Sequence, residues 1–230
     1  MLPIGDAMRS RTRPIVTQLL IAANVAVFAL MALSGDQARR LTVDFGLVPS
    51  RLFSPEAWRE LGPELSVLPL ISFMFLHGGL LHLGSNMLFL WVFGDNVEER
   101  MGRLRFLMFY LVCGWISGIG FALLQPSSDM PLVGASGAIA GVLASYAALF
   151  PTARIRTLVF LFIFVTFIEL PAAFFVGYWF LLQILNGVLV PSSSNIAWWA
   201  HIFGFVAGWV MTRAWFPPRR PEPRYRITIG

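Results

Sequence analysis

The stretch GASGAIAGVLASYAALFP (residues 134–151) decides how this sequence can fold. It begins with small residues, continues as an apolar run to Phe150 and stops at Pro151. The pattern predicts a helix of about 14 residues, because a proline is not tolerated in a helix interior. A helix needs about 20 residues to cross the hydrocarbon core of a bilayer. We therefore expect a short apolar helix that does not reach both membrane faces.

Longer apolar segments flank this short helix on both sides. The segment between residues 34 and 66 is mixed, with prolines and charges of both signs. Residues 68–76 are apolar but too few to cross a bilayer, which suits an interfacial or partly inserted piece. The pattern predicts an all-α membrane protein with six transmembrane helices, the fourth of them short. The predicted helices are residues 15–33, 80–97 and 104–124, the short helix of about 14 residues that ends at Phe150, and residues 171–190 and 197–216.

The composition excludes the other common classes of protein. Of the 230 residues, 57% are hydrophobic and 13% are charged, whereas soluble domains have about a quarter of charged residues. A soluble globule cannot hide so much apolar surface behind so few charges. Cys113 is the only cysteine, so no internal disulfide framework is possible. A polytopic membrane protein remains.

The arginines indicate how the helices are oriented. All 17 basic residues are arginines, and 13 of them fall on one side if the N-terminus is inside. The other four lie in the 34–66 loop, together with five acidic residues. This distribution obeys the positive-inside rule. Counting the apolar segment 158–170 as a seventh helix would place the basic tail outside, so we prefer six.

The chain divides into one membrane domain and two short ends. We expect a cytoplasmic N-terminal segment (1–14), a membrane domain (15–216) and an Arg- and Pro-rich cytoplasmic tail (217–230) that is disordered. No small-residue cleavage site follows residues 15–33 at once, so this segment is predicted to be a retained helix rather than a signal peptide. We expect a bacterial plasma membrane, with both termini cytoplasmic.

The chain has three histidines, and all lie in or beside apolar segments. Polar groups inside a membrane are costly and indicate function by default. His82 and Asn86 are four residues apart and share one helical face. These groups could also act only as packing contacts between helices, and for His77, before a Gly-Gly break, we favour a hydrogen bond to the backbone. The spacing of His77 and His82 is not that of a zinc helix, and we expect neither a metal nor another cofactor. A nucleic-acid partner is not expected either.

Ser136 and His201 form a candidate catalytic pair. Small residues in membrane helices usually permit close packing, and alone Ser136 would be read in that way. Ser136, however, opens the short helix, and glycines four residues apart occur on its helix and on the helix of His201. Two such helices can bring a serine and a histidine within hydrogen-bond distance, which activates serine as a nucleophile. Asp129 could approach, but a Ser–His dyad is the simpler hypothesis. The glycines expected to support the packing are Gly137, Gly141, Gly204 and Gly208.

Three motifs, taken together in order, carry a resemblance to a known family. HGGLLHLGSN (77–86), GASG (134–137) and AHIFG (200–204) lie on the second, fourth and sixth predicted helices. The chain closely resembles the rhomboid intramembrane serine proteases over nearly its whole length. The resemblance implies that Ser136 is the nucleophile and His201 the base. It also implies that His82 and Asn86 help to bind the oxyanion, and that Gly134 lies in the loop before the serine.

The resemblance implies an endopeptidase that cleaves transmembrane protein substrates within the lipid bilayer, near its outer face. The alternative is a catalytically silent pseudoprotease that binds or routes membrane proteins. A transporter would need internal repeats, and none is seen. One departure concerns Ala140, where some family members have a tyrosine that stacks on the histidine. What orients His201 is therefore left open, as are the oligomeric state and the substrate.

Overall fold

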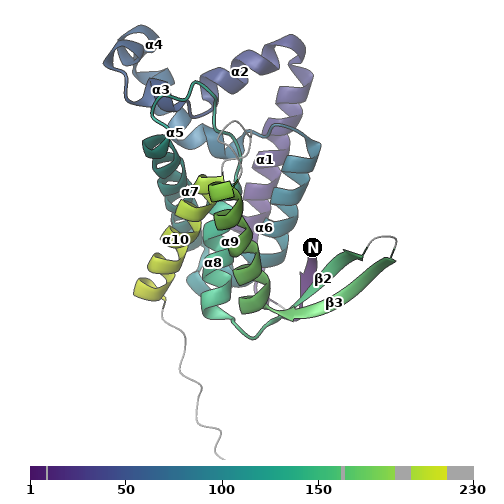
Figure 1. The fold of residues 1–230 in the computed structure, drawn as a ribbon. Helices are drawn as coiled ribbons and strands as arrows, with labels where there is room; N and C mark the ends of the chain where they lie inside the picture. The colour runs from purple at the N-terminus through teal and green to yellow at the C-terminus, as the bar shows by residue number, and fades with distance from the viewer. Residues whose placement is uncertain (9, 162–163, 190–197, 217–230) are drawn as a thin grey trace, which may run out of the picture.

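The computed structural model describes residues 1–8, 10–161, 164–189 and 198–216, and most of them are helical. Figure 1 shows the long helices running side by side as a bundle. Their bounds are α1 (Ile15–Leu33), α6 (Leu80–Met101), α7 (Arg103–Leu124), α8 (Ser136–Leu149), α9 (Ala172–Leu189) and α10 (Trp198–Trp215). These bounds agree with the six predicted helices to within a few residues. The predicted ends at residues 190 and 197, and the predicted tail 217–230, lie outside the described residues.

Several of these helices have the length and apolar character of membrane spans. In the described part of the chain, α1, α7 and α9 could each cross a bilayer, with mean hydropathies of 2.2, 2.0 and 1.7. A fourth candidate is the pair Glu64–Phe75 and Leu80–Met101, which is bent by 74°. Only 17% of the α1 window and 22% of the α9 window are buried inside the protein. Such exposed apolar surface requires lipid around it, so the protein is an integral membrane protein.

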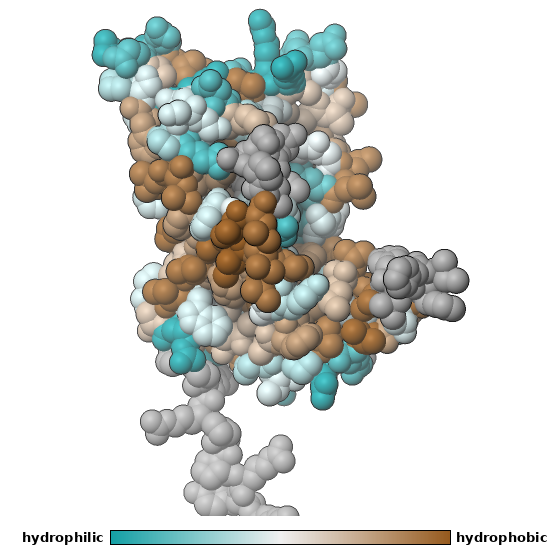
Figure 2. All heavy atoms as spheres, in the orientation of Figure 1, coloured by the Kyte–Doolittle hydropathy of each residue, from teal (hydrophilic) through white to brown (hydrophobic). Residues whose placement is uncertain are grey.

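A polar segment closes one end of the bundle, between α1 and α6. It contains η1 (Gly35–Gln37), α2 (Ala38–Phe45), α3 (Pro49–Leu52), α4 (Pro55–Val67), α5 (Pro69–Ser72) and η2 (Phe73–Phe75). Figure 2 shows hydrophilic side chains gathered at this end and hydrophobic ones over the middle of the bundle. The apolar piece predicted at 68–76 forms α5 and η2. Phe73 and Met74 are buried there, which anchors the segment to the helices.

The other end carries a small antiparallel sheet that the sequence analysis did not predict. Its strands, β1 (Leu2–Asp6), β2 (Arg154–Leu161) and β3 (Phe164–Pro171), lie in the order β1-β2-β3. The β2–β3 pair projects sideways from the bundle in Figure 1. A seventh helix over 158–170 is therefore wrong, because the β-branched and aromatic residues of this segment favour paired strands. The N-terminal segment is also more than a tail, since β1 pairs with β2.

A buried glutamate joins α1 to α6. Both carboxylate oxygens of Glu98 accept hydrogen bonds, from the backbone nitrogens of Val16 and Thr17 at 3.0 and 2.8 Å and from the Thr17 hydroxyl at 2.8 Å. The first turn of a helix has free N–H groups and the positive end of the helix dipole. A buried carboxylate supplied by a neighbouring helix therefore satisfies the start of α1.

The short helix α8 is the centre of the bundle. Twelve of its 14 residues are buried, and it contacts α6, α7, α9 and α10. A Cβ on Gly204 would overlap the backbone of Gly137, and a Cβ on Gly208 would overlap that of Gly141. The backbones of α8 and α10 therefore touch directly, as the glycine spacing predicted.

Candidate active site

Ser136 lies at the first position of α8, at the end of a tightly held loop. The loop is paired with distant residues, because Leu132 forms a β-bridge with Leu47 and the Gly134 nitrogen donates a 2.9 Å hydrogen bond to the Phe73 carbonyl. Gly134 has a backbone φ of 126°, a conformation that residues other than glycine rarely adopt. The loop thus presents the Ser136 hydroxyl from a rigid turn at the end of a buried helix.

Ser136 and His201 are hydrogen-bonded to each other. The distance between Ser136 Oγ and His201 Nε2 is 2.8 Å, and both residues are only partly buried. The close approach depends on the glycine contact between α8 and α10. Ser117 of α7 adds to it, since its hydroxyl packs where Gly137 has no side chain and donates a 2.7 Å hydrogen bond to the Ala200 carbonyl. The position of His201 is therefore set by the backbone beside it.

The second nitrogen of His201 contacts a residue that the sequence analysis missed. His201 Nδ1 lies 2.7 Å from Gln183 Oε1, and Gln183 is buried on α9. Two indoles surround the ring, with centroids 5.9 Å away for Trp179 and 6.2 Å away for Trp198. The available signal in the sequence was an amide within a largely apolar helix. Asp129 is exposed and is not among the partners found for His201 in the described residues.

His82 and Asn86 lie on α6, beside the serine loop. A Cβ on Gly134 would come 2.8 Å from the His82 ring, so this ring packs directly against the loop. Asn86 is 7% exposed, and within the described residues its amide nitrogen has no hydrogen-bond partner. A buried donor without a partner is costly. A donor left free in this way is available to a ligand atom in the site.

The backbone group that interacts with His77, as favoured for it, is that of Phe75. His77 is buried, and among the described residues neither ring nitrogen makes a hydrogen bond of standard geometry. Its ring also packs edge-to-face on His82, with centroids 5.1 Å apart. His77 therefore supports His82 through van der Waals contact.

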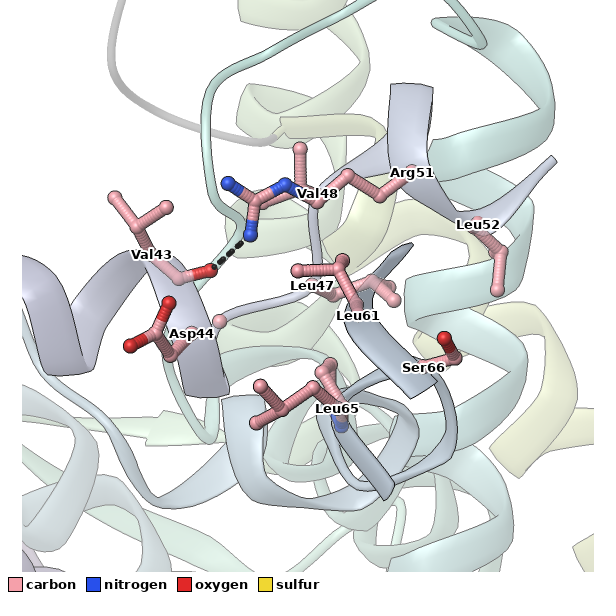
Figure 3. Close-up of a pocket in the computed structure, with 11 residues that line it drawn as sticks. Val43, Asp44, Leu47, Val48, Arg51, Leu52, Leu61, Leu65 and Ser66 are labelled. Carbon is pink, nitrogen blue, oxygen red and sulfur yellow. Dashed lines mark hydrogen bonds between the residues drawn. The ribbon is translucent and has the colours of Figure 1, made fainter. Parts of the chain in front are cut away.

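The rest of the described chain shows no competing site. No group of three or more His, Cys, Asp or Glu side chains able to hold a metal occurs in the parts that the structure describes. A pocket among α2 to α5 has a volume of about 20 Å³, room for about one water. Across this pocket Arg51 donates a hydrogen bond from its guanidinium group to the Val43 carbonyl oxygen, with a nitrogen–oxygen distance of 3.1 Å (Figure 3). None of its lining residues comes from α8 or α10.

Fold and site together define a class: an integral membrane protein with a hydrogen-bonded Ser–His pair where its central short helix begins. The comparison with known families agrees with this class. The model of the rhomboid domain matches residues 56–218, and the chain belongs to the rhomboid family.

Curated relatives come from bacteria and from eukaryotic organelles. The chain is 36% identical over 133 residues to "Rhomboid protease GluP" of Bacillus subtilis, covering 57% of this chain and 24% of the relative. It is 32% identical over 154 residues to "Rhomboid protein 1, mitochondrial" of Saccharomyces cerevisiae, covering 61% of this chain and 38% of the relative. It is 31% identical over 152 residues to "RHOMBOID-like protein 6, mitochondrial" of Arabidopsis thaliana, covering 56% of this chain and 49% of the relative. The chain thus spans between about a quarter and a half of the length of these relatives.

Proposed function

We propose that this protein is an intramembrane serine endopeptidase that cleaves transmembrane protein substrates. The observation that carries the proposal is the 2.8 Å hydrogen bond between Ser136 Oγ and His201 Nε2. A serine alone is a weak nucleophile, and an adjacent general base activates it. A family with members named as proteases supports the same assignment.

The reaction follows from these two side chains. Ser136 Oγ attacks the scissile carbonyl carbon while His201 Nε2 takes the hydroxyl proton. The tetrahedral intermediate collapses as His201 gives this proton to the leaving amine, which leaves an ester on Ser136. Water then attacks the ester carbonyl, loses a proton to His201 and releases the acid, and Ser136 recovers its proton from His201.

The oxyanion of each intermediate requires preorganised donors. We assign this role to the Asn86 amide, the His82 imidazole and the backbone N–H of Ser136. The free amide nitrogen of Asn86 supports the assignment, as does the packing of the His82 ring on Gly134. The Ser136 N–H belongs to the first turn of α8, whose donors have no partner within the helix.

For the membrane arrangement we propose that the chain crosses the bilayer six times, and that the fourth crossing includes the loop before α8, because α8 alone is too short to reach both faces. Both termini lie on the cytoplasmic side of a bacterial plasma membrane, because 13 of the 17 arginines then face inward. The Ser136 end of α8 is tied to the polar segment between α1 and α6, whereas its other end leads to β2. The active site therefore opens near the outer face, and cleavage occurs there. Reporter fusions at positions 130 and 222 should read outside and inside.

The test is covalent labelling of the purified protein with a fluorophosphonate, followed by mapping of the modified residue. Ser136 should be labelled, and Ser136→Ala should be neither labelled nor able to cleave a model transmembrane substrate. Ser145→Ala is the matched control, because Ser145 is buried on the same helix and should keep turnover. Full turnover in Ser136→Ala would overturn the mechanism. A folded wild-type protein that is neither labelled nor active would indicate the pseudoprotease.

A further inference from the structure

The amide of Gln183 has a defined orientation. Its Nε2 donates a 3.1 Å hydrogen bond to the carbonyl oxygen of Trp179, one turn earlier on α9. A carbonyl oxygen only accepts hydrogen bonds, so the nitrogen end of the amide must face Trp179. The oxygen end must then face His201, 2.7 Å from Nδ1.

This orientation determines where the proton of His201 lies. An amide oxygen only accepts, so Nδ1 must carry the hydrogen that it shares with Gln183. In a neutral imidazole the other nitrogen then has a lone pair, and this nitrogen is Nε2, which contacts Ser136 Oγ. The serine hydroxyl could not decide this alone, because it can donate or accept. Gln183 therefore selects the one tautomer in which His201 can take the serine proton.

We propose that Gln183 is the third member of the site, a positioning residue that holds His201 in the tautomer and orientation needed for base catalysis. This inference rests on the proposed peptidase function. The residue acts through His201 and touches no substrate. With Trp179, which lies one turn earlier and packs near the same ring, it replaces the aromatic contact that Ala140 does not provide.

A neutral amide suits this position better than a carboxylate. Gln183 is 5% exposed and lies within an apolar helix that faces lipid over most of its surface. An ionised carboxylate in such surroundings carries a large desolvation cost. The amide accepts the same Nδ1 hydrogen without a net charge, and it still accepts when His201 is protonated during the reaction.

The experiment compares three variants with the wild type: Gln183→Leu, Gln183→Glu and Asn186→Leu. Leucine has no acceptor, whereas a glutamate side chain keeps one at the same place. Asn186→Leu is the matched control, because Asn186 makes the same kind of bond to its own helix, 2.7 Å to the Leu182 carbonyl. Two readouts are measured on each folded protein, kcat on a model transmembrane substrate and the ¹⁵N signals of the His201 ring, assigned by their loss in His201→Ala.

In the wild type at pH 8, Nδ1 should be protonated and Nε2 should not. Gln183→Leu should populate the other tautomer and lower kcat by roughly 10- to 100-fold, since small misplacements of a catalytic group cost about this much. Gln183→Glu should keep the wild-type tautomer and turn over faster than Gln183→Leu. Asn186→Leu should match the wild type in both readouts.

An unchanged tautomer and kcat in Gln183→Leu would overturn the proposal, as would equal losses in Gln183→Leu and Asn186→Leu. If Gln183→Leu does not fold, loss of the wild-type tautomer in Gln183→Glu would also overturn the proposal. The ¹⁵N readout does not depend on turnover. An inactive wild type would therefore refute the peptidase while the Nδ1 proton still tests the role of Gln183.

Discussion

Gly204→Ala tests whether direct backbone contact between α8 and α10 sets the geometry of the Ser136–His201 pair. A Cβ at residue 204 would lie 2.7 Å from the carbonyl carbon of Gly137 and nearer still to its oxygen. Unbonded carbon atoms rest at about 3.5–4.0 Å, so α10 has to retreat by about 1 Å. The distance from Ser136 Oγ to His201 Nε2 would then grow from 2.8 Å to about 3.8 Å, beyond hydrogen-bond range.

The expected result is a loss of about 10²-fold in turnover per folded molecule, the usual cost of a 1 Å displacement of this kind. Overpacking should also cost about 1–3 kcal/mol of stability, partly offset by the gain of about 1 kcal/mol for Ala over Gly within a helix. Turnover of a model transmembrane substrate and thermal unfolding are measured on the same detergent preparations. Gly177→Ala is the control, since a Cβ there meets nothing within 4 Å. A folded Gly204→Ala protein with wild-type turnover would refute the reasoning.

Three further changes test other parts of the structure. Asn86→Ala should lower kcat by about 10²–10³ with little change in KM, because its hydrogen bond strengthens only in the transition state; steady-state kinetics at equal folded fraction check this, and unchanged kcat would remove Asn86 from the site. Burial raises the pKa of Asp6 above its ordinary value of 3.8, so wild-type stability falls as pH rises through that raised pKa. Asp6→Asn should therefore raise the melting temperature at pH 7 but not near pH 3, and an equal shift at both would contradict this cause. Ala140→Tyr should cost about 1–3 kcal/mol, because Ala140 is fully buried, and should not raise turnover; a stable, faster variant would show that His201 is loosely held.

The β2–β3 pair marks one limit of prediction from sequence. The sequence analysis describes residues 158–170 as an apolar segment and predicts no strand there. Short apolar runs do not distinguish a strand from a buried helical segment. The partner of β2 on one side is β1, from the distant N-terminus. Such pairing depends on where the bundle brings the two segments, which the local pattern of residues does not contain.

The candidate site, too, could be predicted from the sequence only in part. The histidines could be recognised in advance because ionisable groups are unusual in a membrane segment, and the glycines because they repeat at helical spacing. Ser136 could be recognised because it opens the short helix, within the GASG motif. Gln183 was missed because an uncharged amide in an apolar helix is a weak signal, and α9 carries a second one at Asn186. The role of Gln183 could not be predicted, because the sequence does not say which face of α9 packs against His201 of α10.

The sequence by itself determined that this is a membrane protein with a short apolar helix, which residues are candidates for the chemistry, and that glycines permit close packing. These properties follow from composition, segment length and local periodicity, which depend only on neighbouring residues. The tertiary structure alone decided that Ser136 and His201 are 2.8 Å apart, that Gln183 faces Nδ1, that Glu98 satisfies the start of α1, and that the N-terminus forms a strand. Each of these joins residues far apart in the chain. Their contact energies exist only when the packed helices bring them together.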